Sequence, residues 1–224
     1  MPAAGPQRTI RSFVLRQGRI TRGQRAAFTK LMPRYGLNPA HGPFDFISVF
    51  GRAVRRTLEI GFGNGEALVA LARAHPEEDF LGIEVHRPGI GRLLLALDTK
   101  KLTNVRVVCA DAVEVLQRCV PDASLDAVLL FFPDPWPKKR HHKRRLVQAE
   151  FIALLAQKLK SGGRLQLATD WPDYAAHMLA VLNSSRVFSN CTTDGGYTPR
   201  PPTKFERRGL ALGHPVCDLE FVRR

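Results

Sequence analysis

Four carboxylates stand at or just after four short apolar stretches, where each could meet a ligand. Glu59 lies in TLEI and begins the glycine-rich stretch EIGFGNGE. Glu84, Asp111 and Asp134 come at the end of, or just after, FLGIEV, VRVVCA and LDAVLLFF. Carboxylates in such places can hold cationic groups, accept hydrogen bonds from sugar hydroxyls, or offset positive charge that develops in a reaction. Because Glu59 precedes the glycine loop, that loop suits a cationic ligand group better than a pyrophosphate.

Gly61, Gly63 and Gly65 predict a sharp turn at which a ligand can approach the backbone before a helix begins. Ordinary tight turns also use glycine, so this pattern alone is weak evidence. The dinucleotide-binding pattern requires Gly or Ala where this chain has Glu66, which disfavours an NAD-dependent dehydrogenase. Glu84 lies nineteen residues past Gly65, a spacing at which an acid commonly accepts hydrogen bonds from both ribose hydroxyls.

Two roles suit Asp111. It could accept a hydrogen bond from an adenine amino group, or it could cap a helix over AVEVL, and the second role is at least as good as the first. Taken with Glu59 and Glu84, it outlines a pocket for adenosine without a phosphate site. S-adenosylmethionine has that shape, since it joins adenosine to a cationic sulfonium amino acid. We therefore expect S-adenosylmethionine as the cofactor.

The stretch FFPDPWPKKRHHKRRL, residues 131–146, combines a stiff loop with a basic run. Asp134 lies between two prolines, which fix backbone angles and can hold its carboxylate in one direction. Trp136 could stack on a base or cover the edge of the core, and we favour packing. Six of the next eight residues after Pro137 are Lys or Arg. We expect them around the start of a helix over 143–160, where positive charge opposes the helix dipole, and so interpret them as a polyanion site beside the reaction centre.

The elements that must position these groups alternate along the chain. Apolar runs predict strands at 57–60, 80–85, 105–110, 125–132 and 164–169. Helical patterns lie between them, at 66–73, 89–98, 112–119, 143–160 and 172–182. This alternation predicts a mostly parallel sheet with helices on both faces, whose strand ends gather the acids at one edge. Residues 187–191 and 217–222 add an antiparallel pair with no helix between them, and residues before Phe44 and 195–209 are expected to be irregular.

The 224 residues carry a formal net charge of +14, which favours a polyanionic partner, above all nucleic acid. The alternative is a generally basic surface that keeps the protein soluble. The four cysteines include no CxxC pair and no clustered His ligands, so we expect no metal and a reducing cytoplasm. We see no membrane span and no signal-peptide core. Residues 1–44 hold eight Lys or Arg and no acid, which is also typical of a transit peptide.

Several motifs together resemble those of the bacterial tRNA (guanine-N7-)-methyltransferase family: EIGFGNGE, GIEVHRPGIG, FFPDPWPKKRHHKRR, LATDWPDYAAHM and TKFE. RSFVLRQGRIT resembles the N-terminal segment of that family, so a cleaved transit peptide is not expected. The resemblance extends from about Arg11 to the C-terminus, and PDPWPKKRHHKRR is its most specific part. It implies a Rossmann-like class I methyltransferase fold of about seven strands. We expect a basic arm over residues 1–43 and the methyltransferase domain over 44–224.

The resemblance also implies an activity, the transfer of methyl from S-adenosylmethionine to N7 of a guanosine in the variable loop of tRNA. It places catalysis at Asp134. Cofactor binding is expected at Glu59, Glu84 and Asp111, together with the loop glycines Gly61, Gly63 and Gly65. Substrate binding falls on Lys138, Asp170, Thr203, Lys204, Phe205 and Glu206. Contacts with RNA are expected at Arg140, His141, His142, Lys143, Arg144 and Arg145, and a monomer and a homodimer are left open.

Guanine N7 carries an in-plane lone pair and no proton, so its methylation requires alignment and no base. We expect Asp134 to position guanine through its N1–H and 2-amino donors and to offset the charge that develops on the purine. Asp170 could share this work or cap the helix that begins at Pro172. Phe205 could stack on the base, and Glu206 could accept a hydrogen bond from the base or the cofactor.

Two alternative functions stay open from the sequence. The first is an enzyme of the same fold that acts on another substrate, such as ribosomal RNA or a protein side chain. The second is a non-catalytic RNA-binding module on the same fold. The four acids at 59, 84, 111 and 134 speak against the second alternative, because a binding module has no need of a methyl-donor site.

Overall fold

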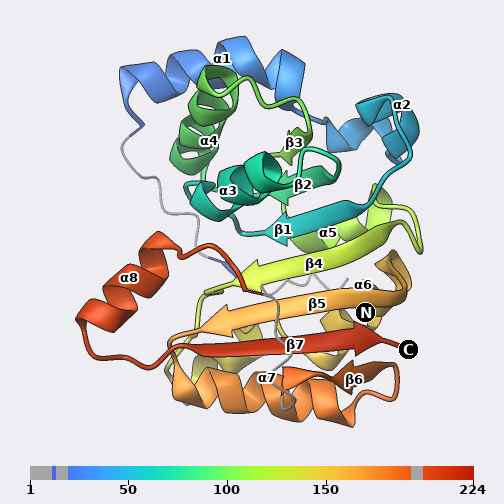
Figure 1. The fold of residues 1–224 in the computed structure, drawn as a ribbon. Coiled ribbons are helices and arrows are strands. Elements are labelled where there is room, and N and C mark those ends of the chain that lie inside the picture. The colour runs from blue at the N-terminus through green and yellow to red at the C-terminus, as the bar shows by residue number, and fades with distance from the viewer. Residues whose placement is uncertain (1–11, 14–19, 193–198) are drawn as a thin grey trace, which may run out of the picture.

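The computed structural model describes residues 12–13, 20–192 and 199–224, and its centre is a seven-stranded sheet (Figure 1). The strands lie in the order β3-β2-β1-β4-β5-β7-β6. Their bounds are β1 Arg56–Ile60, β2 Asp79–Ile83, β3 Val105–Val108, β4 Leu125–Phe131, β5 Leu159–Thr169, β6 Phe188–Asn190 and β7 Cys217–Arg223. Strands β1 to β5 pair in parallel, and β7 is antiparallel to both β5 and β6. The predicted mostly parallel sheet with an antiparallel C-terminal pair is confirmed.

Helices cover both faces of this sheet (Figure 1). They are α1 Arg22–Tyr35, α2 Phe46–Phe50, α3 Glu66–Ala74, α4 Arg87–Thr99, α5 Ala112–Arg118, α6 Ala149–Lys158, α7 Pro172–Ser184 and α8 Lys204–Ala211. Helices α1, α3 and α4 share a core with Phe80 and Val107, whereas α5, α6 and α7 share a core with Leu58 and Leu130. Burial on both faces explains why the strand sequences are almost continuously apolar. In the described part of the chain, no helix is long and apolar enough to cross a membrane.

The direction of the sheet's crossovers reverses at β1, which lies between β2 and β4. Open sheets of this kind bind ligands beyond the carboxyl ends of the strands, at the point of reversal. The carboxyl ends of β1 to β5 are Ile60, Ile83, Val108, Phe131 and Thr169, and the arrowheads of β1, β4 and β5 point the same way in Figure 1. The candidate acids follow these ends, so the fold directs them to one edge.

Helix α1 replaces the irregular structure that we predicted before Phe44. It begins with a capping box, in which the Gln24 backbone N–H donates to the Thr21 hydroxyl at 3.2 Å and the Gln24 side chain accepts from the Thr21 N–H at 2.9 Å. The helix packs closely on α4, because a Cβ added at Gly91 would come within 2.7 Å of the Gln24 carbonyl oxygen. Tyr35 is buried in the same core. The predicted boundary at residue 43 therefore does not separate α1 from the rest of the fold.

Helix α8 lies between β6 and β7, where we predicted no helix. Thr203 and Glu206 form a second capping box, with both of its backbone-to-side-chain hydrogen bonds at 3.1 Å. The expectation of irregular structure over 195–209 is therefore wrong from Lys204 onward. Residues 193–198 lie outside the described residues.

The connection from β4 to β5 also differs from the prediction. The helix expected over 143–160 begins only at Ala149, and Lys139–Arg144 form a 3₁₀ helix. Strand β5 begins at Leu159, not at residue 164, and the pairing jumps from Leu159 opposite Leu125 to Arg164 opposite Ala127. The intervening bulge contains Gly162 at φ +75°. Because the basic run does not start the α-helix, our dipole argument for a polyanion site was wrong, and only the positions of the cations can support such a site.

Candidate active site

Glu59 is a buried carboxylate at the point of reversal. It is 3% exposed, and its Oε2 atom has no hydrogen-bond partner among the described residues. Burial, and then the nearby charge of Glu84, raise the pKa of Glu59 to about 8. Glu59 lines a cavity of about 30 Å³ together with Gly61, Phe62, Asn64, Glu66, Ala67, Phe131, Phe132, Thr203 and Lys204. An unsatisfied buried carboxylate is costly, and a cationic ligand group is the partner that would satisfy it.

The glycine loop after β1 has the conformation that its sequence requires. Gly61, Gly63 and Gly65 all have positive φ, at 72°, 56° and 75°. A Cβ added at Gly65 would lie 2.6 Å from Leu93 of α4, so this position packs against the core. A Cβ added at Gly61 would meet no atom of the residues that the structure describes within 4 Å. The loop is thus fixed on its α4 side and leaves space beside Gly61.

Glu84 and Asp111 follow β2 and β3 as predicted. Glu84 accepts three backbone hydrogen bonds, from Gly63 at 2.8 Å, Val85 at 2.7 Å and His86 at 2.9 Å. It therefore joins the glycine loop to the end of β2, and its two oxygens retain lone pairs for further donors. Asp111 accepts from the Val113 N–H at 2.8 Å and caps α5. The capping role is confirmed, and a contact with adenine stays a prediction.

Asp134 is exposed in the loop after β4. On either side of it, Phe132 and Trp136 have φ of +53° and +45°. Such values are rare for large side chains and persist only where the surroundings impose them. The expectation of a stiff loop thus agrees with the backbone conformation, although the strain lies beside the prolines and not at them.

Arg145 connects this loop to helix α7. Its side chain is 1% exposed and forms an ion pair with the Asp173 carboxylate of α7. Its Nε atom donates to the Pro135 carbonyl oxygen at 2.9 Å, and its guanidinium lies 4.9 Å from the centre of the Tyr174 ring. We predicted that Arg145 contacts RNA. A buried guanidinium that is already bonded to the protein cannot do so, and we now assign Arg145 to positioning the Asp134 loop.

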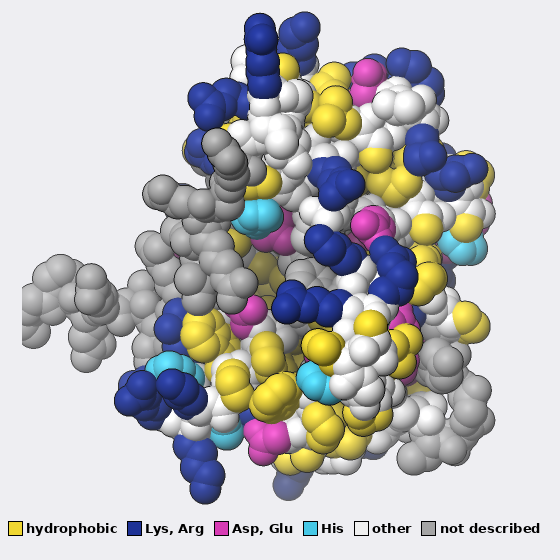
Figure 2. Space-filling view, turned by 90° about the vertical axis from the view of Figure 1, so that its left-hand side faces the viewer, with side chains coloured by type: hydrophobic (Ala, Val, Ile, Leu, Met, Phe, Trp, Pro, Cys, Tyr) yellow, Lys and Arg dark blue, Asp and Glu magenta, His cyan; other side chains and the backbone are white. Residues whose placement is uncertain are grey.

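The rest of the basic run lies mainly on the surface. Trp136 donates from Nε1 to the Ser12 carbonyl oxygen at 2.9 Å, and the Arg144 guanidinium is 3.7 Å from the centre of its ring. Trp136 is thus held by contacts within the protein, and the packing role at the edge of the core stays a prediction. His141 and His142 are half-buried, and slight burial followed by the charge of Arg140 lowers the pKa of His141. Four cations are exposed: Lys138, Lys139, Arg140 and Lys143. Figure 2 shows the face of the molecule to which the arrowheads of β1 and β4 point, and Lys and Arg side chains gather there around a hollow.

Helix α8 brings the predicted TKFE segment to the cavity. Thr203 and Lys204 line it beside Glu59. Glu206 accepts a hydrogen bond from the N–H of the N-cap residue Thr203 and two from the Arg200 guanidinium, at 2.8 and 3.1 Å. Burial opposes ionisation of Glu206, but the hydrogen bonds from Arg200 outweigh it and lower its pKa. The side chain of Phe205 lies outside the described residues, so the prediction that it stacks on a base stays open.

Asp170 follows β5 but does not cap the next helix. The N-cap of α7 is Trp171, which makes no side-chain capping bond. The Asp170 carboxylate instead faces α8, where a Cβ added at Gly209 would lie 2.8 Å from its Oδ2 atom. The same oxygen is 3.7 Å from His214 Nδ1. The capping alternative is therefore wrong, and Asp170 joins β5 to the segment that carries Thr203.

Arg200 is a site residue that the sequence analysis missed. Its side chain is 6% exposed and donates to Asp218 of β7 at 2.5 Å as well as to Glu206. The guanidinium also lies 5.4 and 5.3 Å from the ring centres of Phe131 and Phe132. Arg200 thus fixes α8 against the end of β4. On the outer side, Arg207 of α8 pairs with Glu66 of α3 at 2.5 Å, across the cavity that Glu66 lines.

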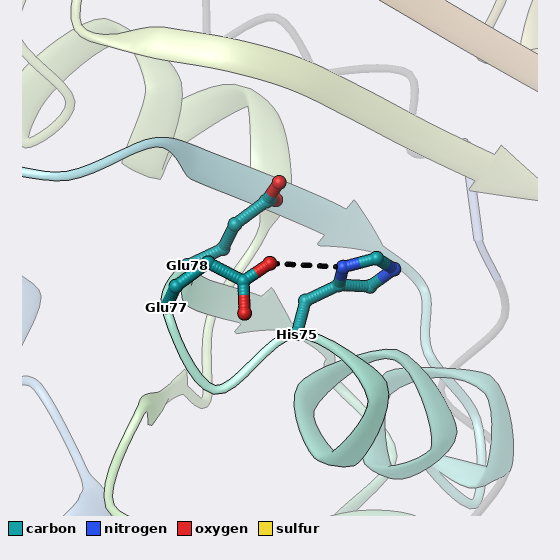
Figure 3. A group of neighbouring side chains, drawn as sticks. All are labelled: His75, Glu77 and Glu78. Atoms are coloured by element: carbon teal, nitrogen blue, oxygen red, sulfur yellow. Dashed lines mark hydrogen bonds and ion pairs between the residues drawn. The ribbon is translucent and has the colours of Figure 1, made fainter.

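One group of side chains in the described ranges could share a cation: His75, Glu77 and Glu78 (Figure 3). It lies in the turn between α3 and β2, at the opposite end of β2 from Glu84. His75 bonds to Glu77 at 3.1 Å, and Glu78 pairs with Arg55 at 3.0 Å. These partners account for the group without a metal, and we assign no metal site to it.

A family model described as "Putative methyltransferase" matches residues 54–219. The tRNA (guanine-N(7)-)-methyltransferase of Stutzerimonas stutzeri is 56% identical, over 98% of this chain and 94% of that protein. The enzyme of the same description from Nitrosococcus oceani is also 56% identical, over 96% and 92%. The chain belongs to the tRNA (guanine-N(7)-)-methyltransferase family. The predicted resemblance is confirmed.

Solved structures support the fold expected for this family. An rRNA methylase from Streptococcus thermophilus matches with a TM-score of 0.52 at 16% identity, over 79% of this chain and 90% of that one. The aminoglycoside resistance methyltransferase NpmB1 matches with a TM-score of 0.54 at 16% identity, over 84% and 94%. At such identities the likeness concerns the fold alone, which is the predicted Rossmann-like methyltransferase fold.

Proposed function

We propose that this chain transfers the methyl group of S-adenosylmethionine to N7 of a guanosine in the variable loop of tRNA. The observation that carries the proposal is the 56% identity to a tRNA (guanine-N(7)-)-methyltransferase over 98% of the chain. Among the described residues, the buried Oε2 of Glu59 beside a glycine loop has no hydrogen-bond partner, which supports the cofactor. A tRNA substrate also gives the exposed cations of the basic run a partner, and we expect a cytoplasmic location for such an enzyme.

The residues at the strand ends fit S-adenosylmethionine. When bound, the cofactor supplies a methyl group on a positively charged sulfur. Glu59 would pair with its cationic amino group, because that carboxylate is buried and its Oε2 atom has no donor in the described part of the chain. Glu84 would accept from the ribose hydroxyls, and Asp111 from the adenine amino group. Gly61, Gly63 and Gly65 keep the backbone of this wall free of side chains.

Asp134 would act on the guanine. N7 attacks with its own lone pair, so the carboxylate has no proton to remove. It would accept hydrogen bonds from N1–H and the 2-amino group, and its charge would stabilise the purine as it becomes cationic. The stiff loop fixes the direction of the carboxylate, because Arg145 donates a hydrogen bond to the Pro135 carbonyl oxygen next to it. Further contacts with guanine or its nucleotide are proposed for Lys138, Asp170, Thr203, Lys204, Phe205 and Glu206.

The RNA backbone would lie over the basic run. We propose contacts from Arg140, His141, His142, Lys143 and Arg144 and leave Arg145 out, because its side chain is buried. The target guanosine must leave its stack for its edge and face to be reached, which is easier in a tRNA loop than in a continuous helix.

Paired transcripts test the choice of substrate. We expect methyl transfer from labelled S-adenosylmethionine to a tRNA transcript with guanosine in the variable loop, and at least about 100-fold less transfer when adenosine replaces it, because adenine lacks the N1–H and 2-amino donors. A ribosomal RNA fragment of similar length serves as the control. Equal labelling of the two transcripts, or preferred labelling of the ribosomal fragment, would refute the proposal.

Substitution of Arg200 tests whether α8 must be fixed over the site. Arg200→Lys keeps the charge but cannot bond Glu206 and Asp218 at once with a planar fork. We expect a roughly tenfold lower kcat/KM for methyl transfer and weaker cofactor binding, with most thermal stability retained. Arg200→Met should cost roughly 3 kcal/mol of stability as well, because two carboxylates lose their cation. Arg186→Lys, at an exposed site, is the matched control. Wild-type kinetics for Arg200→Lys would rule out a positioning role.

A further inference from the structure

The charge on the two helical layers of the protein is strongly unequal. Helices α1, α3 and α4 and the two lysines that follow α4 hold nine Lys or Arg and two acids, Glu66 and Asp98. On the opposite face of the sheet, α5, α6 and α7 hold two Lys or Arg and three acids. A basic surface that served solubility alone would need no such division. The basic run after β4 is one concentration of positive charge, and the α1–α4 side is a second, which favours a polyanion there as well.

Helix α1 presents its cations outward. Arg22, Arg25, Lys30 and Arg34 are exposed, whereas Ala27 on the opposite side of the helix is buried. The Arg34 guanidinium forms an ion pair with the Asp98 carboxylate at 3.5 Å, and both side chains are exposed to solvent. Arg22, Arg25 and Lys30 form no ion pair within the described ranges, and residues 1–44 contain no acid at all. These three cations are thus available to an external partner.

The surface is also preformed. The capping box at Thr21 fixes the start of α1, and the close approach at Gly91 fixes the helix against α4. The Leu37 N–H donates to the Val107 carbonyl oxygen of β3 at 2.8 Å, which fixes the chain beyond the helix. A rigid array of cations loses little entropy when it binds, so each contact contributes more of its energy to affinity.

The position of α1 relates this surface to the active site. In Figure 1 the start of α1 lies on the side to which the arrowheads of β1 and β4 point. Viewed from that side, Lys and Arg side chains lie at the top of the molecule, at the level of α1 and α4, as well as around the hollow (Figure 2). One extended polyanion can therefore contact both the basic run and α1.

We infer that the α1–α4 surface is a second RNA-binding surface, which holds the backbone of the same tRNA outside the target loop. The inference rests on the proposed function, because it takes tRNA as the polyanion. The contacts are with phosphates and carry no sequence information. The basic run and Asp134 would then place the target guanosine, while α1 holds the body of the tRNA.

The test compares two triple variants that lose the same charge. The first combines Arg22→Gln, Arg25→Gln and Lys30→Gln. The second, as control, combines Arg73→Gln, Arg118→Gln and Arg186→Gln, at exposed positions outside α1 and α4. Dissociation constants are measured at several salt concentrations for a full-length tRNA transcript and for a short hairpin that contains only the variable loop and its neighbouring stem. The affinity for S-adenosylmethionine and the thermal stability are measured in parallel.

The α1 variant should bind full-length tRNA about tenfold more weakly than the control variant does. The slope of its log affinity against log salt concentration should be shallower by the equivalent of about two to three phosphate contacts. Its binding to the hairpin, its affinity for S-adenosylmethionine and its stability should match those of the control. Equal binding of full-length tRNA by the two variants would overturn the inference, and so would equal losses on tRNA and hairpin. The proposed function fails separately, if the unmodified protein binds full-length tRNA but transfers no methyl group to it.

Discussion

Replacing Asp134 by Asn should lower the single-turnover rate of methyl transfer by about 100-fold or more, with little change in the affinity for tRNA or S-adenosylmethionine. The amide keeps the size of the side chain but loses the charge that offsets the cationic purine and can present a donor to the guanine donors. Loss of one such preorganised electrostatic contact commonly costs about 10²–10³ in rate. The effect belongs to the rate and not to binding, because the charge on the purine develops only during transfer.

The pH profile separates positioning from proton removal. Guanine N7 has no proton to lose, so the residual rate of Asp134→Asn should not rise with pH. A variant that had lost a general base should instead gain rate as hydroxide replaces the base. Glu150→Gln, at an exposed carboxylate of α6, is the control and should retain the original rate. A near-normal rate for Asp134→Asn would remove Asp134 from the catalytic site.

Replacing Glu59 by Gln should have two opposite effects, a more stable ligand-free protein and a cofactor that binds about 100-fold more weakly. The folded protein raises the pKa of Glu59 from 4.5 to about 8. Between these pH values the folded state keeps a proton that the unfolded chain releases. The ionisation of Glu59 therefore lowers the free energy of unfolding as pH rises. Gln carries no such cost, and above about pH 8 the gain should reach roughly a few kcal/mol.

Thermal unfolding at pH 5 and pH 8, together with calorimetric titration of S-adenosylmethionine, measures both effects. The stability advantage of Glu59→Gln should be small at pH 5 and large at pH 8. Glu84→Gln is the comparison, and it should lose stability because its carboxylate accepts three backbone hydrogen bonds. A Glu59→Gln protein that is less stable at pH 8, or that keeps its cofactor affinity, would contradict the role that we assign to Glu59.

The central sheet could be predicted from the sequence because its strands are buried on both faces and stand out as apolar runs. The same logic placed Glu59, Glu84 and Asp134 at one edge, since parallel strands end together. The boundary of β5 was wrong, because Gly162 and its neighbours form a bulge within the strand and not a stop before it. A pair of glycines indicates an irregularity in the backbone, but it does not distinguish a turn before a strand from a bulge within it.

Two of the helices that the sequence analysis missed, α1 and α8, carry a visible signal. Thr21 and Gln24, and likewise Thr203 and Glu206, have the T-x-x-Q or T-x-x-E spacing of a capping box. We expected irregular structure in both segments, and Pro33 even lies inside α1. Capping and packing on one apolar side outweighed composition in both cases, so the capping spacing was the better guide.

Tertiary contacts that the sequence does not announce decide the roles of two arginines. Arg145 stands among exposed cations, and only its ion pair with Asp173, 28 residues later, turns it inward. Arg200 lies in a proline-rich segment, yet it bonds to Asp218, 18 residues later. Neither pair has a local spacing rule of the kind that governs helices and hairpins. From net charge alone, a generally basic surface could not be distinguished from a binding site for a polyanion, whereas the structure shows on which helices the charge lies.

Nucleoside analysis of tRNA is the most direct test of the central claim, that the acids at the strand ends bind a methyl donor for a guanine presented by the neighbouring cations. Unmodified tRNA is treated with the purified protein and S-adenosylmethionine, digested to nucleosides and separated. The account predicts 7-methylguanosine as the product, at a position in the variable loop. A different methylated nucleoside, or no methylated nucleoside at all, would contradict it.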